Sequence, residues 1–589
     1  MHEMETCLVD GRLQRVYRNL WPSTRDFWLS SVSQHGSKTY IVEPGRQRTT
    51  YEQLHEQAVR AANLFRRVYG VRKESEYVLE IVPNTLQPSG LVVCLSLLFG
   101  IARLLSRFQE LLGAVTVNVN AWLPIEPLSF CITHTECKLL LVDVERADKL
   151  EPALDVIFSK GCLDNVLVIT VNEEEHRRRW RGMETFRSVL QDNLSTTAEP
   201  LPAVEIDPED NAVIMFTSGT TGLPKGVLST QRQFLTNILN TLVGNRRAAL
   251  RRGEDLAPAQ DDGPQKGALV AVPLFHVTGL TSYSMMATML GYKIVLMRKW
   301  IPEEASRLLS EENIGVAGGV PAMVQDIMDH CVGNCSLEGL FFGGSPAPNI
   351  LVETARKVFP NTRLSQAYGL TETNSIAVAI AGDDYTSRPT STGIACPVND
   401  MLVMSGNKVA PPGTVGEIWL RGPNVMKGYW RDPEATSKVL TSDGWLRTGD
   451  IGMMDNEGFL YVKDRIKDII IRGGENIASI AVENALYMDS RVMEVAAVGV
   501  PDTRLGELVA AVVSVKPPFR GKVTETSLIE LSRKKLPRFA VPVMIIVRDE
   551  PFELTPSGKI MKAPLRELAK QYWEDRLSSL HQDKVRANL

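Results

Sequence analysis

The stretch AVIMFTSGTTGLPKGV, residues 212–227, joins an apolar run to a loop rich in glycine and hydroxyl side chains. The apolar residues 212–215 predict a buried strand. In the loop, glycines allow the backbone N–H groups to converge on one point, the hydroxyls can donate hydrogen bonds, and a lysine adds positive charge. These residues are Thr217, Ser218, Gly219, Thr220, Thr221, Gly222, Lys225 and Gly226. The combination predicts a phosphate-binding loop.

A flexible Ser/Thr/Gly linker would have a similar composition. Two features favour the phosphate loop: apolar strands flank it, and it contains the Pro-Lys-Gly unit at residues 224–226. The Gly-Lys-Ser/Thr order of a Walker A loop is absent, so we predict a loop of another kind.

The segments around this loop predict an α/β fold. Short apolar runs at residues 77–82, 114–119, 138–143 and 165–170 are separated by helix-length stretches. That pattern is typical of parallel strands covered on both faces. Residues 51–65 have apolar side chains at helical spacing and predict an amphipathic helix. We therefore expect doubly wound sheets.

The character of the chain changes after about residue 400, where dense Gly/Pro turns predict a small β-subdomain. A new unit follows, with predicted strands at residues 468–472, 494–500 and 507–515 and helices between them. We expect a large N-terminal domain over residues 1–465, a small mobile C-terminal α+β domain over residues 467–575, and a tail over residues 576–589.

Composition limits the classes of function. A chain of 589 residues exceeds one hydrophobic core, and 44% apolar with 23% charged residues is typical of a globular protein. The net charge of −4 gives no general attraction to nucleic acid, so we expect no nucleic-acid partner. The eight cysteines are scattered, which is more typical of reduced thiols than of a disulfide framework.

We also expect no transmembrane segment. The N-terminus is polar, and the apolar run at residues 90–102 is shorter than the roughly 20 residues that a membrane helix needs. Cytoplasm is the expected compartment. The C-terminal Ala587-Asn588-Leu589 only loosely resembles a peroxisomal address, which leaves the peroxisome as the alternative.

The segment TSGTTGLPKG, residues 217–226, resembles the signature of the adenylate-forming enzymes, which include acyl-CoA synthetases, peptide-synthetase adenylation domains and luciferases. The resemblance extends over residues 25–570 through several motifs in the family's order. One departure lies at residues 85–112, which relatives lack. This stretch is either a true insertion or a translated non-coding piece.

A second motif is YGLTET, residues 368–373. Tyr368 offers a flat face to a purine, Thr371 can hydrogen-bond a phosphoryl oxygen, and Glu372 is a hard oxygen ligand suited to Mg²⁺. The resemblance implies these roles, with Gly369 beside the nucleotide. An ordinary helix start, with a threonine cap and an acid in its first turn, is the alternative.

Other motifs supply further nucleotide and thiol contacts. Asp450 can accept both hydroxyls of a ribose, and the resemblance implies that role. It also implies that Arg465 holds the ribose or phosphate and that Lys467 is a hinge. The backbone at Gly473 and Gly474 would then meet the pantetheine thiol.

Two residues complete the implied catalytic set. Lys559, in TPSGKIMK at residues 555–562, resembles the catalytic lysine that bridges the carboxylate and the α-phosphate. His276, in PLFHVTG at residues 273–279, matches a histidine beside the carboxylate. Segments that fit the acyl tunnel contain Gly318, Gly319, Val320, Gly343, Gly344 and Ser345. Near residue 479 the family often has proline and glutamate where this chain has Ser479 and Ala481, whereas Glu483 fits.

The resemblance implies an acid–thiol ligase. It would activate a fatty, aryl or secondary-metabolite acid with ATP and Mg²⁺ and transfer the acyl group to coenzyme A, as a monomer or a homodimer. A free-standing enzyme that loads a carrier protein or an amine is one alternative; only 30 residues follow Lys559, so we expect no attached carrier domain. A non-catalytic acyl or nucleotide sensor is another.

Overall fold

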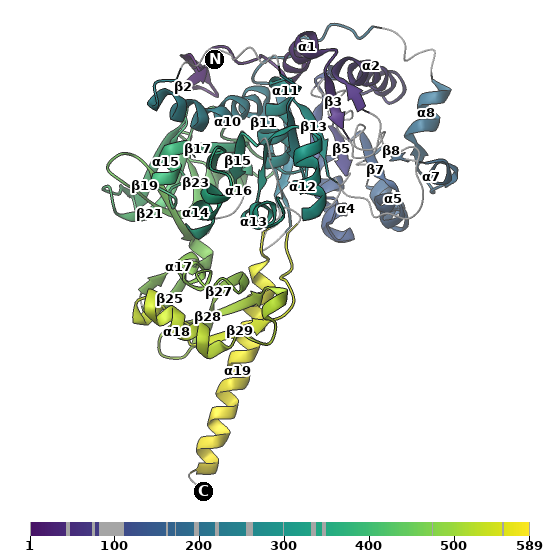
Figure 1. Cartoon of the computed structure of the whole chain (residues 1–589). Coiled ribbons are helices and arrows are strands. Elements are labelled where there is room, and N and C mark those ends of the chain that lie inside the picture. Colours follow the sequence, from purple (N-terminus) through teal and green to yellow (C-terminus); the bar gives the residue numbers. More distant parts are fainter. Residues whose placement is uncertain are drawn as a thin grey trace.

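A large N-terminal part and a small C-terminal part make up the molecule (Figure 1). The computed structural model describes the whole chain except the following residues: 1, 43–47, 74–76, 82–110, 161–162, 171, 194–199, 218–222, 255–262, 298–299, 332–336, 344–348, 474, 556–558 and 588–589. The predicted insertion at residues 85–112 therefore lies almost entirely outside the described residues.

The first sheet contains the strand that precedes the phosphate loop. β10 (Asn211–Thr217) pairs in parallel with β6 (Val115–Asn118) and antiparallel with β11 (Lys225–Thr230). The described strands have the order β22-β11-β10-β6-β5-β7-β8-β9. The other bounds are Tyr77–Ile81 for β5, Leu139–Asp143 for β7, Asn165–Ile169 for β8, Glu184–Thr185 for β9 and Gly428–Tyr429 for β22. β5 to β8 run parallel, which confirms the predicted strands.

The second sheet has the order β18-β17-β16-β15-β14-β12-β13-β3-β4 in the described part of the chain. Strands β3 and β12 to β16 are parallel to their neighbours in this group, and antiparallel strands flank them. The bounds are Thr39–Val42 for β3, Arg48–Thr50 for β4, Gly267–Val270 for β12, Lys293–Leu296 for β13, Ile314–Gly319 for β14, Gly339–Phe342 for β15, Arg363–Leu370 for β16, Ser375–Ala381 for β17 and Ile394–Ala395 for β18.

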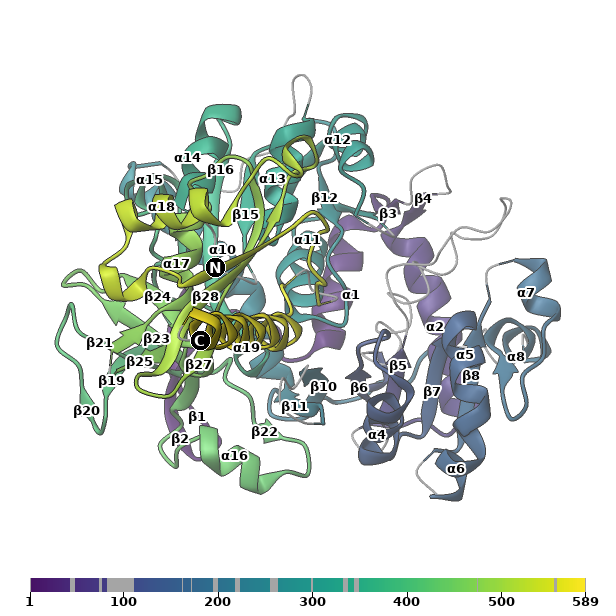
Figure 2. The same ribbon diagram turned by 90° about the horizontal axis from the view of Figure 1, so that it is seen from below.

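Helices cover both sheets, and α12, α13 and α14 gather on one side of the second sheet (Figure 2). The predicted helix at residues 51–65 is α2 (Tyr51–Val68), which starts with a capping box between Thr50 and Gln53. The other N-terminal α-helices are α1 Thr24–His35, α4 Ile125–Thr135, α5 Val144–Leu150, α6 Leu154–Ser159, α7 Glu173–Arg177, α8 Phe186–Asp192, α10 Gln231–Arg251, α11 Met286–Met289, α12 Pro302–Glu311, α13 Pro321–His330, α14 Asn349–Val358, α15 Gly382–Ser387 and α16 Pro433–Val439.

The predicted β-subdomain is confirmed as an antiparallel sheet with the order β20-β19-β21-β23-β24. Its bounds are Asp400–Ser405 for β19, Lys408–Val409 for β20, Val415–Arg421 for β21, Leu446–Met454 for β23 and Leu460–Arg465 for β24. The N-terminal hairpin consists of β1 (Met4–Val9) and β2 (Arg12–Tyr17). The 3₁₀ turn η4 (Ile466–Asp468) leads from β24 into the C-terminal part.

The C-terminal part corrects one prediction. β27 (Val492–Asp502) and β28 (Gly506–Val515) form an antiparallel hairpin, so the helix expected between these strands is wrong. Three residues join the strands, too few for anything but a turn. The strand expected at residues 468–472 starts later, at Ile470. The remaining bounds are Ile470–Arg472 for β25, Glu475–Ile477 for β26, Ser479–Leu486 for α17, Glu525–Lys535 for α18, Met544–Arg548 for β29 and Lys562–Ala587 for α19.

Two further expectations concern membranes and cysteines. In the part of the chain that the structure describes, no helix is long and apolar enough to span a membrane. Cys331, at the end of α13, is disulfide-bonded, so the expectation of reduced thiols is wrong there. The scattered spacing of the cysteines carried no signal of this bond. Cys7, Cys131, Cys137 and Cys396 are not part of a disulfide bond.

A network of buried asparagines joins α10, the second sheet and the β-subdomain. Its members are Asn237, Asn240, Asn374, Asn399 and Asn424, all at most 4% exposed. At the start of β17, the Ile376 N–H donates to Asn237 Oδ1 (2.7 Å), and the Ile376 carbonyl accepts from Asn240 Nδ2 (2.7 Å). Asn424 Nδ2 donates to the carbonyls of Thr373 (2.8 Å) and Ile376 (3.1 Å). The network therefore fixes the turn that follows Glu372.

We predict that Asn424→Ala lowers the free energy of unfolding by about 3 kcal/mol, because it leaves buried polar partners without hydrogen bonds. Chemical denaturation measures the change. Asn456→Ala, at an exposed position, is the control and should change it by less than about 0.5 kcal/mol. Equal stability of the two variants would contradict a structural role for the network.

Candidate active site

The predicted phosphate loop joins the paired strands β10 and β11. Thr217 ends β10, Lys225 starts β11, and the two residues are paired in the register. The exposed Lys225 places its Nζ 4.9 Å from the centre of the Tyr429 ring. The predicted ligands Ser218, Gly219, Thr220, Thr221 and Gly222 lie outside the described residues.

Tyr429 connects this loop to Glu372. Its hydroxyl donates to Glu372 Oε1 (2.8 Å), and β22, which carries Tyr429, pairs with β11. The carboxylate of the half-buried Glu372 retains acceptor capacity, as a metal ligand must. The sequence analysis missed Tyr429, because its closeness to Glu372 arises only from strand pairing between residues far apart in the chain.

The turn of residues 371–376 is tightly constrained. Thr371–Thr373 forms the 3₁₀ turn η3 rather than the alternative helix start. Asn374 and Ser375 follow with φ of 53° and 106°, which side-chain-bearing residues rarely adopt. Gly369 is required at its position, because a Cβ there would lie 1.5 Å from the Ser375 carbonyl oxygen.

Asp450 lies in the interior of the site, at 5% exposure. Its Oδ2 accepts from the Tyr368 hydroxyl (2.7 Å), and its Oδ1 lies 3.2 Å from Arg465 Nε. Burial raises the pKa of Asp450, while Arg465 and Tyr368 act in the opposite direction. Both oxygens retain lone pairs for a ribose.

Lys559 reaches this cluster from the C-terminal part. The Lys559 N–H donates to Thr555 Oγ1 (3.0 Å) and the Lys559 carbonyl accepts from the Thr555 N–H (2.6 Å), which closes the turn that carries the lysine. Desolvation lowers the pKa of Lys559 to about 8; Arg465 adds to this effect, and Asp450 and Glu372 oppose it. The four groups therefore face one another across the two parts.

His276 belongs to the same cluster. Burial lowers its pKa to about 3, and the charge of Lys559 contributes. The imidazole is therefore neutral at physiological pH. The structure thus brings together Lys559, Glu372, Asp450, Arg465 and His276, whose roles stay predictions.

Gly473 lies elsewhere, in an exposed turn between β25 and β26. Its φ is 58°, and its N–H donates to the Leu505 carbonyl of the same C-terminal part (2.7 Å). Gly474 lies outside the described residues. The exposed Lys467 lies in η4, and desolvation and Arg465 lower its pKa.

Polar contacts hold α17 and α19 against the end of the β-subdomain. Lys562 Nζ, at the start of α19, contacts Glu483 Oε1 (2.7 Å) and donates to Ser479 Oγ (2.6 Å). The backbone N–H of Ser479 donates to Asp464 on β24. The serine that departs from the family pattern therefore accepts a hydrogen bond from Lys562. The sequence analysis did not single out Lys562 or Asp464.

A cavity adjoins the strand that carries Tyr368. It is lined by residues of α10, the π-helical segment η2 (Thr278–Met285) and strands β14 to β17. Val316 and Phe341 line it, whereas Gly318, Gly319, Val320 and Gly343 lie further along the same strands or just beyond them. Gly344 and Ser345 lie outside the described residues. Their role in an acyl tunnel stays a prediction.

The fold and this cluster define a two-part α/β protein in which Lys559 of the C-terminal part lies within electrostatic range of Glu372, Asp450 and Arg465. The sequence profile of the AMP-binding enzyme family matches residues 29–430, and that of the AMP-binding enzyme C-terminal domain matches residues 481–559. The chain belongs to this family, which confirms the resemblance to adenylate-forming enzymes.

Relatives and solved structures agree with this assignment. The long-chain-fatty-acid–CoA ligase FadD13 of Mycobacterium tuberculosis is 31% identical over 89% of this chain and 94% of its own. The 2-methylpropanoate–CoA ligase CCL4 of Humulus lupulus is 30% identical over 78% and 82%. The fold is similar to that of O-succinylbenzoate coenzyme A synthetase from Bacillus subtilis in complex with ATP and magnesium ion, with a TM-score of 0.71, 23% identity and coverage of 93% and 99%.

We predict that kcat/KM for ATP falls as the pH rises through about 8, because only the protonated Lys559 carries the charge needed beside the phosphates. Initial rates of pyrophosphate release from pH 6 to 10 measure the profile. In Lys559→Arg the guanidinium stays charged, so the alkaline fall should move to higher pH even if the rate is lower. The same fall in both proteins would contradict the assignment.

Proposed function

We propose that this chain activates a carboxylic acid with ATP and transfers the acyl group to coenzyme A, giving acyl-CoA, AMP and pyrophosphate. The observation that carries the proposal is the convergence of Lys559 with Glu372, Asp450 and Arg465. The named relatives are CoA ligases, which supports coenzyme A as the acceptor. The compartment and the choice between monomer and homodimer stay predictions.

In the first half-reaction the carboxylate attacks the α-phosphorus of ATP, the bond to the β-phosphate oxygen breaks, and pyrophosphate leaves. Lys559 would bridge the attacking carboxylate and the α-phosphate and stabilise the negative charge that develops there. Asp450 would accept from the ribose hydroxyls, with Arg465 beside it. The neutral, half-buried His276 would lie at the carboxylate.

Glu372 fits a magnesium site, because Mg²⁺ in nucleotide enzymes is held by one or two carboxylates together with substrate phosphates. Tyr429 orients the Glu372 carboxylate by its hydrogen bond to Oε1. Bound Mg²⁺ would supply positive charge to the phosphates. The hydroxyls and N–H groups of residues 217–222, together with Lys225 and Thr371, would donate to the phosphate oxygens.

The second half-reaction needs a different arrangement, because Gly473 is exposed and bonded within its own part. We propose that residues 467–575 rotate about Lys467 and present the turn at Gly473 and Gly474 to the pantetheine arm. The thiol then attacks the acyl carbon of the adenylate, and AMP leaves.

Lys559→Ala should lower pyrophosphate exchange by at least about 100-fold, because one charge that stabilises the transition state is lost. The same variant should still convert a preformed acyl-adenylate to acyl-CoA. Lys570→Ala, at an exposed position on α19, is the matched control and should exchange normally. Normal exchange by Lys559→Ala would rule out the proposed role.

A second variant separates the half-reactions. Gly473→Ala should slow conversion of the preformed adenylate by coenzyme A, because the added Cβ lies at a positive φ and 2.9 Å from Leu505 Cδ2. Pyrophosphate exchange should stay near the normal rate. Gly521→Ala is the control, since Gly521 has a φ of 67° in the same part and its Cβ would meet no atom within 4 Å.

Equal effects of the two glycine variants on thioester formation would contradict a role for Gly473 at the thiol. Replacing coenzyme A by phosphopantetheinylated carrier protein in this assay tests the alternative acceptor directly.

A further inference from the structure

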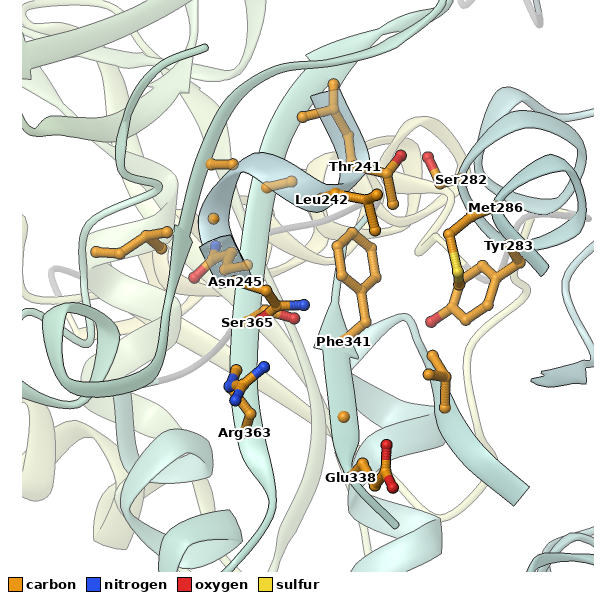
Figure 3. Close-up of a pocket in the computed structure, with 18 of the residues that line it drawn as sticks. Thr241, Leu242, Asn245, Ser282, Tyr283, Met286, Glu338, Phe341, Arg363 and Ser365 are labelled. Atoms are coloured by element: carbon orange, nitrogen blue, oxygen red, sulfur yellow. The ribbon is translucent and has the colours of Figure 1, made fainter. Parts of the chain in front are cut away.

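The cavity beside Tyr368 has a volume of about 160 Å³ and lies between α10, η2 and the second sheet (Figure 3). Its walls are largely apolar, with Leu242, Met286, Phe341 and Ile376 among the lining side chains. The rings of Tyr283 and Phe341 pack edge to face at 5.8 Å. A dry apolar cavity of about 150 Å³ holds a benzene molecule, so this volume corresponds to one aromatic ring rather than a long chain.

The direction of the strands places the cavity relative to Tyr368. β15 and β16 are parallel, and Arg363 starts the strand on which Tyr368 lies five positions later. At about 3.3 Å per residue, Arg363 is roughly 17 Å from Tyr368 along the strand. Glu338 and Arg363 lie together at one end of the cavity, and Thr241 and Ser282 lie at the other (Figure 3). An acid that reacts near Tyr368 would therefore extend toward the Arg363 end.

Three polar atoms in the wall of the cavity are buried without a hydrogen-bond partner among the described residues. They are Tyr283 Oη, Gln366 Oε1 and Asn245 Oδ1, from η2, β16 and α10 respectively. Other polar side chains in the wall are paired: Glu338 with Lys266 (2.9 Å) and Ser282 with Ser375 (2.9 Å). Buried polar groups in proteins are normally hydrogen-bonded, so these atoms point to a partner that the protein itself does not supply.

The backbone is shaped around the Tyr283 hydroxyl. At Gly318, with a φ of 142°, an added Cβ would lie 2.8 Å from Tyr283 Oη and 2.1 Å from the Phe341 carbonyl oxygen. Tyr283 itself lies in a π-helical segment, a rare geometry that occurs most often at functional sites. Both features hold the hydroxyl in place.

We propose that the acid is a single-ring aromatic acid with a hydroxyl or amino group on the ring, bound by Tyr283, Gln366 and Asn245. The two amide oxygens accept hydrogen bonds, and the Tyr283 hydroxyl can donate or accept one. These three groups therefore match a ring substituent that is a hydrogen-bond donor. An unsubstituted ring or a saturated chain would leave these atoms unpaired, and such sites discriminate strongly against the analogue that lacks the polar group. This inference rests on the proposed function.

Pyrophosphate release tests the proposal with the full chain, ATP, Mg²⁺ and a panel of acids: benzoate, its 3- and 4-hydroxy and amino derivatives, phenylacetate, 4-hydroxyphenylacetate, octanoate and hexadecanoate. We expect kcat/KM for the best hydroxylated or aminated ring to exceed that of its unsubstituted parent, and of both fatty acids, at least tenfold. Release with a fatty acid or an unsubstituted ring as the best substrate would overturn the proposal but leave the ligase function intact. If none of the acids supports pyrophosphate release, both the proposed substrate class and the proposed ligase function are contradicted.

Tyr283→Phe, which removes only the hydroxyl, should reduce the preference for the substituted ring over the unsubstituted ring at least fivefold. Tyr385→Phe is the matched control. Tyr385 is also buried, and its hydroxyl has no hydrogen-bond partner among the described residues, but it does not line the cavity. An unchanged preference in Tyr283→Phe, or an equal loss in both variants, would overturn the assignment of Tyr283.

Binding of benzoyl- and 4-hydroxybenzoyl-sulfamoyl adenosine, measured by calorimetry, gives a readout independent of turnover. We expect the hydroxylated analogue to bind at least tenfold more tightly. Equal affinities of the two analogues would contradict the proposal.

Discussion

The hydrogen bonds from buried asparagines to the turn of residues 373–376 are the constraint on which the site depends. This turn has to reverse β16 into β17 directly after Glu372, and it does so with two consecutive side-chain-bearing residues at positive φ. Such conformations cost of order 1–3 kcal/mol each and persist only where the surroundings determine them. Asn237, Asn240 and Asn424 pair with the backbone groups on either side, so the network offsets the strain and holds Glu372 toward Tyr429.

The same burial determines the electrostatics. Lys559 and Arg465 face Asp450 and Glu372, with Lys467 also close to Asp450. Desolvation lowers the pKa of Lys559 and that of Lys467, and repulsion from the positive charge of Arg465 lowers both further. A polyanion placed among these groups would relieve that repulsion. Repulsion among these cations therefore favours a polyanionic ligand, which supports the predicted phosphate site.

Local pattern was sufficient to predict strands β5 to β8 and β10 of the first sheet, helix α2 and the β-subdomain, because burial on both faces, helical periodicity and turn residues leave direct traces in sequence. The motif residues Lys559, Glu372, Asp450, Arg465 and His276 could be predicted to converge, and the structure places them together. The β27–β28 hairpin was missed although residues 501–506, the only ones between the two predicted runs, are too few for a helical crossover. Tyr429 and the asparagine network also escaped prediction, because their partners are set by strand pairing and packing between segments distant in sequence.

Strand β16 carries both Gln366, which we propose binds the acid, and Tyr368, the predicted nucleotide contact. Gln366 and Tyr368 are two residues apart, so their side chains leave the strand on the same face, one toward the cavity and the other toward Asp450. The pairing of β16 with β17 shifts register between Tyr368 and Gly369, where only a glycine fits against the Ser375 carbonyl. A displacement of β16 by a badly fitting acid would therefore move Tyr368 and Asp450 together. In this arrangement a badly fitting acid would bind more weakly and would also misplace the groups that take part in the first half-reaction.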